Sequence, residues 1–456
     1  MLGIYQNWGF RASPFETRPL PANEEGEKLL IGREVEVDKI VRRILTPNKI
    51  ITVEGANGIG KTSINNVASF IAFRSFLNGE IDQLLVPCEK AFQLRADSKI
   101  DEFVEHVFLY VGLTLVKYGE ILTKSGRGSQ TEGAVAAWLT SPVFQTVRGS
   151  LSVYGIGGLG GGVGMTANTS TGFSRAGFSD LIRTWLAEIF PNSEGGGIIC
   201  TIDNLELLRE SEAARTSLEA LRDEILNIPG LRWIICGSTG IVRTLASTPR
   251  LHGYLHAPIE IGDVDHGISG SILHSRAEAY KIRDDAYLPL RASDFALLYS
   301  VLKGNIRDSL SEADNFCNWV ADQGEEYIED KARHGQFKSW LAQECGERLE
   351  AAESIMSARP WQLFDEIIKC GGQCSPGAYK DFGFETPQAM RFQVLTLEAA
   401  NLVKSVRNEE DNRRKTILVT SSGWMVEYAK QISPRTLFSS RGDLPYVLEY
   451  DHEDHA

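Results

Sequence analysis

The sequence predicts an α/β fold built on a parallel sheet, followed by a helical region and a small C-terminal domain. Short apolar runs alternate with amphipathic runs between residues 50 and 239. This alternation is typical of a parallel sheet with helices on both faces. A glycine-rich loop joins the first strand to the helix after it. With 456 residues the chain is too long for one ordinary domain, so we expect two or three.

The expected elements follow one another in a regular order. Residues 1–30 are irregular and contain several prolines, so we treat them as an N-terminal extension. Spacing and composition of the apolar residues then predict the strands and helices. Strands are expected at 50–53, 84–87, 197–203 and 231–239, and helices at 35–45, 63–76, 100–117, 178–190 and 205–226.

The glycine-rich loop is the most specific motif in the chain. Gly55, Gly60, Lys61 and Thr62 match G-x-x-x-x-G-K-[ST] without a mismatch, and a strand and a helix flank them as a phosphate-binding loop requires. Backbone N–H groups of such a loop surround an anion, and the helix N-terminus adds partial positive charge. We therefore predict ATP with Mg²⁺, Lys61 at the β- and γ-phosphates and Thr62 on the metal. The predicted nucleotide-binding residues here are Gly55, Ala56, Asn57, Gly58, Ile59, Gly60, Lys61, Thr62 and Ser63.

A carboxylate at the end of a later strand fits the same site. The apolar run 197–203 ends in Asp203. In proteins with a phosphate-binding loop, an aspartate at such a strand end helps to hold Mg²⁺, often through water. Thr62 and Asp203 are therefore the predicted metal-binding residues.

The segment at about 118–176 is predicted to be an insertion in this core. The sequence separation between Lys61 and Asp203 exceeds what one or two βα units would use. The segment is rich in Gly, Ser and Thr and includes the glycine run 155–164. This run contains G-x-G-x-x-G, the pattern of a dinucleotide-binding loop. Glycine is so frequent here that the pattern would match almost by chance, so it does not indicate such a site. A flexible linker or exposed hairpin and a loop that contacts a partner or nucleic acid both remain open.

Taken in order, these motifs resemble the AAA+ superfamily, and within it the replication-initiator ATPases and the related STAND switch ATPases. Three further segments carry the resemblance: Gly32-Arg33-Glu34 before the first helix, Ser238-Thr239 at a strand end, and 302–310, which looks like the helix of a lid. The resemblance implies an ATPase core at 31–265 and a helical lid at 266–350. It also implies that Arg33, Ser238, Thr239 and Arg307 lie at the nucleotide, with Arg307 reaching the γ-phosphate.

The resemblance also implies catalytic residues, with one departure. The segment 248–251 is similar to the one that often holds an arginine finger, which makes Arg250 the candidate and Arg243 a weaker one. AAA+ hydrolases usually follow the strand-end aspartate with a glutamate, but this chain has Asn204 there, and an amide cannot serve as a general base. Glu206 substitutes only if the turn places it correctly. We expect firm binding of Mg·ATP and slow hydrolysis. The predicted catalytic residues are Lys61, Asp203, Glu206, Arg250 and Arg307.

Residues 357–432 resemble a winged helix-turn-helix domain. The expected order is helix, helix, helix, strand, wing, strand, helix, and a Thr-Pro pair opens the third helix as a cap followed by a first-turn proline. The predicted helices are 361–370, 375–382 and 386–400, the strands are 402–407 and 416–420, and a last helix follows residue 423.

The net charge of −13 argues against general affinity for nucleic acid, so any contact with DNA must be local. The predicted nucleic-acid residues are Arg391 on the third helix and Arg413, Arg414 and Lys415 at the tip of the wing. Acidic residues at 409–411 share that wing. A role in protein contacts, or as an extension of the lid, is therefore the alternative. Residues 433–456 are expected to form an acidic tail.

The apolar runs and the cysteines of the sequence bear on the cellular compartment and on zinc binding. No run of about 18 apolar residues is present, and the N-terminus lacks a secretion signal. The seven cysteines are scattered, which disfavours a zinc site and fits a reducing cytoplasm.

Two functions from different classes follow. The first is an ATP-dependent, DNA-associated switch ATPase of an initiator-like, mobile-element or phage-defence type, acting as a homo-oligomer if Arg250 reaches a neighbouring site. The second is a nucleotide-gated scaffold that does not hydrolyse ATP and recruits a protein effector. Asn204 favours the second and the basic wing favours the first. A sequence-specific transcription regulator is a third option.

Overall fold

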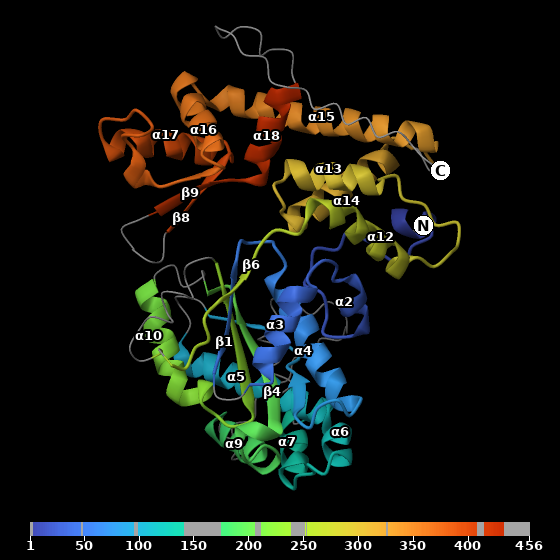
Figure 1. Cartoon of the computed structure of the whole chain (residues 1–456), viewed down its shortest axis with the longest axis vertical. Coiled ribbons are helices and arrows are strands. Elements are labelled where there is room, and N and C mark those ends of the chain that lie inside the picture. The colour runs from blue at the N-terminus through green and yellow to red at the C-terminus, as the bar shows by residue number, and fades with distance from the viewer. Residues whose placement is uncertain are drawn as a thin grey trace, which may run out of the picture.

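The computed structural model describes residues 3–46, 49–94, 99–140, 175–205, 211–238, 251, 253–324, 327–407 and 415–432. An α/β core forms the lower part of the molecule, and helices that follow it in sequence lie above it (Figure 1). The α/β fold with a parallel sheet is therefore confirmed. Among the described helices, none is long and apolar enough to cross a membrane.

The core is a six-stranded sheet in which every strand pair is parallel. Its main path runs β2-β4-β5-β1-β6, and β3 pairs with β4. All four strands predicted from the sequence are present, whereas the short strands β3 and β6 were not predicted. The strands are β1 (Ile51–Gly55), β2 (Leu84–Pro87), β3 (Phe92–Gln93), β4 (Gly196–Asp203), β5 (Leu231–Gly237) and β6 (Ile259–Ile261).

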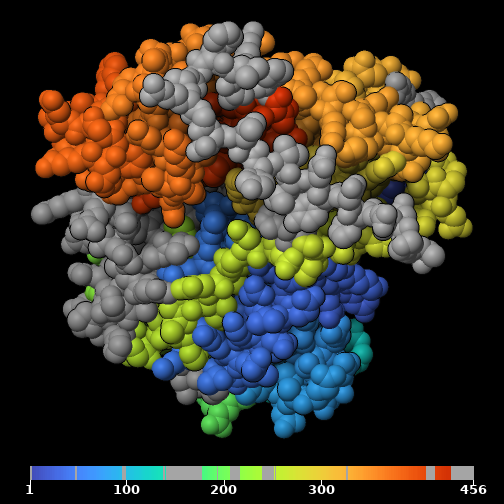
Figure 2. Space-filling model, turned by 45° about the horizontal axis from the view of Figure 1, so that its top comes forward, coloured from blue at the N-terminus to red at the C-terminus, as the bar shows by residue number. Residues whose placement is uncertain are grey.

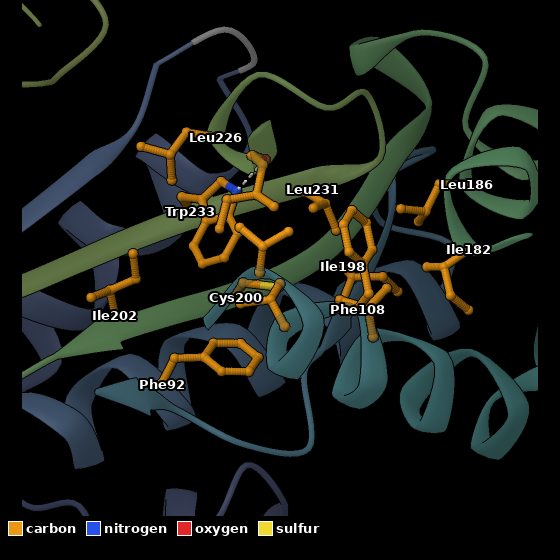
Figure 3. Packing of buried hydrophobic residues seen from close by; sticks show 14 of the residues in the cluster. Phe92, Phe108, Ile182, Leu186, Ile198, Cys200, Ile202, Leu226, Leu231 and Trp233 are labelled. Carbon is orange, nitrogen blue, oxygen red and sulfur yellow. Dashed lines mark hydrogen bonds between the residues drawn. The ribbon is translucent and has the colours of Figure 1, made fainter. Parts of the chain in front are cut away.

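Helices cover both faces of the sheet because successive strand residues point to opposite sides. On β5, Trp233 and Ile235 pack into one apolar cluster, whereas Ile234 and Cys236 pack into the other. The first cluster includes residues of α5, α9 and α10, and Figure 3 shows part of it around Trp233. The second includes residues of α3 and α4. These helices are α3 (Glu34–Ile44), α4 (Lys61–Leu77), α5 (Ile100–Lys117), α9 (Arg175–Ile189), and α10 (Ser211–Leu221) with a π-helical turn at Arg222–Leu226.

Part of the predicted insertion belongs to the core. Residues 119–140 form α6 (Gly119–Lys124) and α7 (Thr131–Thr140). Leu122, Val135 and Leu139 from these helices pack into the same cluster as α5. The glycine run 155–164 lies outside the described residues.

Four helices follow the core in the region predicted as a lid. They are α12 (Ser269–Tyr280), α13 (Ala292–Val301), α14 (Ile306–Asp322) and α15 (Asp330–Ile355). The N-terminal residues, with α1 (Ile4–Asn7) and α2 (Glu24–Leu29), pack against them. Trp8, Phe10 and Phe15 are buried in one cluster with residues of α13 and α14. The Tyr5 hydroxyl donates to Asp314 of α14 at 2.6 Å, so the N-terminal segment and the lid helices form one packed unit.

The C-terminal module, residues 357–432, has most of the predicted elements. Its helices are α16 (Ala358–Lys369), α17 (Pro387–Ala399) and α18 (Ser421–Ile432), and its strands β7 (Gln373–Cys374), β8 (Val403–Arg407) and β9 (Lys415–Val419) pair antiparallel in the order β7-β9-β8. The predicted helix at 375–382 is only the 3₁₀ turn Pro376–Ala378, because Gly377 lies inside the predicted range and Gly383, which has a positive φ, follows it directly.

Candidate nucleotide-binding site

The loop between β1 and α4 has the backbone that its glycines allow. Gly58 and Gly60 have φ angles of +84° and +101°, in the left-handed region that favours glycine. Helix α4 begins at Lys61 without a side-chain cap and without an acidic residue in its first turn. Its first N–H groups are therefore oriented for an anion, and its dipole favours negative charge there.

Lys61 is held inside the curve of this loop. Its side chain is 6% exposed, and Nζ donates to the carbonyl oxygens of Gly55 at 2.8 Å and Ala56 at 3.1 Å. These two hydrogen bonds fix the ammonium within the loop, where it can neutralise a phosphate.

Thr62 and Asp203 come together across the sheet. Thr62 Oγ1 donates to a carboxylate oxygen of Asp203 at 2.5 Å. This contact forms although β5 lies between the strands β1 and β4. Asp203 is almost completely buried, and its other carboxylate oxygen accepts the N–H of Asn204 at 2.9 Å. A hydroxyl and a carboxylate are hard oxygen donors of the kind that Mg²⁺ prefers, so the pair fits this metal.

A cavity of about 240 Å³ opens beside these residues. It is bordered by the phosphate loop, the end of β4, the start of α14 and an N-terminal stretch. The lining residues are Glu16, Thr17, Arg18, Pro19, Asn57, Gly58, Gly60, Lys61, Thr62, Ser63, Asp203, Asn204, Arg276, Ile306, Arg307 and Leu310.

The sequence did not predict the N-terminal wall of this cavity. The stretch 14–20 is anchored to the first turns of α4, because Leu20 donates its N–H to Ser63 Oγ and accepts from Asn66. On the lid side, Arg276 of α12 donates to the backbone carbonyl oxygens of Pro14 at 3.0 Å and Glu16 at 2.9 Å. Arg276 is 6% exposed, and burial lowers its pKa. Three prolines in the N-terminal region were the only sequence sign of a fixed, extended path.

Arg307 lies where the resemblance predicts a lid residue. It is exposed, it is the second residue of α14, and it lines the cavity. The Asn305 side chain caps this helix by accepting the N–H of Asp308. The same Asn305 oxygen packs against the phosphate loop, since a Cβ on Gly58 would lie 2.6 Å from it.

Arg33 contacts the loop through backbone atoms. Its buried guanidinium donates to the carbonyl oxygens of Ile59 at 3.3 Å and Gly262 at 2.7 Å, and pairs with Glu36. It therefore ties the loop to the residue after β6. Direct contact between Arg33 and nucleotide stays a prediction.

The remaining predicted residues fall into three groups. Gly55, Ala56, Ile59 and Ser238 are described but are not among the residues that line the cavity. Arg391 is exposed on α17, and Lys415 begins β9. The following predicted residues lie outside the described part of the chain: Glu206, Thr239, Arg243, Arg250, Arg413 and Arg414.

No protein-family model matches the sequence, and no curated protein matches it either. Solved structures do match. The Orc1 protein of Aeropyrum pernix in complex with DNA is 13% identical, with a TM-score of 0.44 over 92% of this chain and 96% of that one. The Walker-type ATPase PABY2304 of Pyrococcus abyssi is 14% identical, with a TM-score of 0.43 over 91% and 99%.

A third match is Cdc6p from Pyrobaculum aerophilum, at 12% identity and a TM-score of 0.37 over 92% of this chain and 96% of that one. The three matches each cover more than nine tenths of this chain.

Proposed function

We propose that this protein is a Mg·ATP-binding switch ATPase that couples its nucleotide state to DNA or partner binding through its C-terminal module. The observation that carries the proposal is the convergence of Lys61, Thr62 and Asp203 at one cavity, with the uncapped start of α4 beside them. An ammonium, a hydroxyl and a carboxylate in this arrangement are the groups that bind a nucleoside triphosphate with its metal.

Each residue has a distinct role in this proposal. Lys61 and the first N–H groups of α4 bind and orient the phosphates, and Arg307 adds positive charge from the lid. Thr62 and Asp203 hold Mg²⁺, which neutralises phosphate charge when bound. Residues 16–19 and Arg276 close the cavity on the N-terminal side.

Slow hydrolysis is part of the proposal. Asn204 lines the cavity directly after Asp203, and its amide cannot remove a proton from water. Position 204 therefore supplies no general base. Glu206 and Arg250 remain the proposed catalytic partners, and a role for Arg250 in a neighbouring site would make turnover depend on oligomerisation.

For the C-terminal module we propose the winged-helix role. Its three helices and three-stranded antiparallel sheet support this assignment. Helix α17 presents Gln388 and Arg391 on its exposed side, which suits phosphate and base contacts. The proposed wing residues are Arg413, Arg414 and Lys415.

Nucleotide-gated recruitment of a protein effector is the alternative. Phe392 and Leu395 are 68% and 52% exposed on the same side of α17 as Arg391. Large apolar side chains on an exposed helix face are more typical of a protein contact than of phosphate binding. Together with Asn204, these side chains are the observations that support the scaffold alternative.

ATP hydrolysis by the purified protein, measured with and without double-stranded DNA, separates the two functions. Lys61→Ala serves as the blank, and Lys39→Ala, which removes an exposed lysine of α3, serves as the matched control. The proposal predicts slow turnover that rises with DNA in the wild type and in Lys39→Ala, and none in Lys61→Ala. Bound ATP without turnover at any DNA concentration would contradict the DNA-coupled function and support the scaffold.

A further inference from the structure

Helix α14 begins at the cavity and its first turn also contacts the C-terminal module. Asn305, its N-cap, packs against Gly58 of the phosphate loop. Arg307, two residues later, lines the cavity. Asp308, the next residue, accepts hydrogen bonds from the Asn305 side-chain amide at 2.8 Å and from the Ser421 hydroxyl at the start of α18. Only one helical turn therefore separates the phosphate loop from the module.

Helix α18 belongs to two apolar cores at once. Met425 and Ala429 are buried in the cluster of the lid helices, whereas Val426 is buried in the cluster of the C-terminal module. In Figure 1, α18 lies between α15 and α16. Because packed interiors behave as nearly rigid bodies, a shift of α18 against the lid carries the module with it.

Two other contacts place the lid beside α18. Lys303, just before α14, lies over the Trp424 ring at 5.2 Å. Arg348 of α15 binds Glu312 of α14 at 2.7 Å and also contacts the Met425 sulfur. In Figure 2 the lid residues, in yellow to light orange, and the C-terminal module, in orange to red, both lie above the blue core residues.

We propose that Asn305, Asp308 and Ser421 form the relay by which the nucleotide site controls the C-terminal module. This inference rests on the proposed function and names the residues that regulate it. A phosphate bound to Arg307 moves the first turn of α14 against Gly58. Asp308 moves with that turn, and its bond to Ser421 transmits the shift to α18.

The relay makes a specific prediction for Ser421, which lies outside the cavity. Ser421→Ala removes the hydroxyl that donates a hydrogen bond to Asp308. It leaves every residue that lines the cavity unchanged. Ser421→Thr keeps a hydroxyl at the same position. Ser422→Ala is the matched control, because Ser422 is the next residue and is half-buried like Ser421.

The test uses the full chain and two measurements. Fluorescence titration with a methylanthraniloyl-labelled ATP gives the affinity, and hydrogen–deuterium exchange of 421–432 with and without Mg·ATP gives the response of α18. We expect the wild type, Ser421→Thr and Ser422→Ala to change their exchange on binding Mg·ATP. Ser421→Ala is expected to lose this change while its affinity stays within about five-fold of the wild type, the lower end of ordinary coupling between sites.

The outcomes distinguish the relay from the proposed function. A wild type that does not bind the labelled ATP overturns both. A wild type that binds it without any response of α18 overturns the relay alone. A Ser421→Ala variant that responds as strongly as the wild type also overturns the relay and leaves the nucleotide site intact.

Discussion

The backbone conformation at position 204 limits which residues are tolerated there. Asn204 has a φ of 58°, in the left-handed region, where asparagine is tolerated better than most residues. Its N–H bonds to Asp203, so the turn holds the carboxylate in place. A glutamate at this position would carry the backbone cost of the left-handed conformation. The geometry therefore favours asparagine at the place where the resemblance leads one to expect an acidic residue.

This argument makes a prediction about stability. Asn204→Ala should lower the free energy of unfolding by about 1 kcal/mol, because alanine is disfavoured in the left-handed region. Asn204→Gly should leave it nearly unchanged, since glycine adopts this conformation readily. Urea denaturation of the two variants and the wild type measures the difference. Equal loss in both variants would show that the side chain, and not the backbone, is what the position requires.

At the scale of single residues, the sequence predicted the site through a short motif of fixed spacing. A strand, a tight loop and a helix fix Lys61 and Thr62 locally, and the parallel sheet brings Asp203 at the end of β4 beside them. Arg276 was not predicted, because it comes from the middle of α12 and its neighbours in sequence form no motif. Its role depends on a tertiary contact with residues 14–16, which periodicity cannot indicate.

At the scale of elements, the N-terminal segment joins the base of the site to the lid. Leu20 is fixed to α4, Arg276 fixes Pro14 and Glu16 to α12, and Glu27 of α2 pairs with Arg74 of α4. The segment thus connects the two helices on either side of the cavity.

Arg276→Ala tests this connection. The substitution removes a buried charged side chain that donates hydrogen bonds to two carbonyl oxygens. We therefore expect the free energy of unfolding to fall by about 2 kcal/mol. Backbone amides of 14–20 should exchange faster with deuterium than in the wild type. Arg42→Ala, which removes an exposed arginine of α3, is the control. Unchanged exchange at 14–20 in Arg276→Ala would show that the Arg276 hydrogen bonds do not hold the segment.

Sequence patterns predicted long elements better than short ones. The helix at 100–117 agrees with α5 residue for residue, since its apolar spacing is unbroken. The short strands β3, β6 and β7 have two or three residues each, too few for a pattern. The prediction of a helix at 375–382 was wrong, because Pro376 and Gly377 allow only a 3₁₀ turn there.

At the scale of the whole molecule, the lid and the C-terminal module share helices. Helix α15 contributes Trp340 and Cys345 to the lid cluster and Ala352 to the module cluster, which also contains its C-cap residue Met356, and α18 is divided in the same way. Two shared helices leave little freedom for the module to move alone. Under the proposed function, a shift of the lid on nucleotide binding is expected to move the module as well.

The central claim is that Lys61, Thr62 and Asp203 form a Mg·ATP site. Calorimetric titration of ATP into the wild type, with and without Mg²⁺, tests it most directly, with Lys61→Ala and Asp203→Ala as variants. The account predicts binding by the wild type that Mg²⁺ strengthens, no measurable binding by Lys61→Ala, and loss of the Mg²⁺ effect in Asp203→Ala. Wild-type affinity in Lys61→Ala would contradict the account.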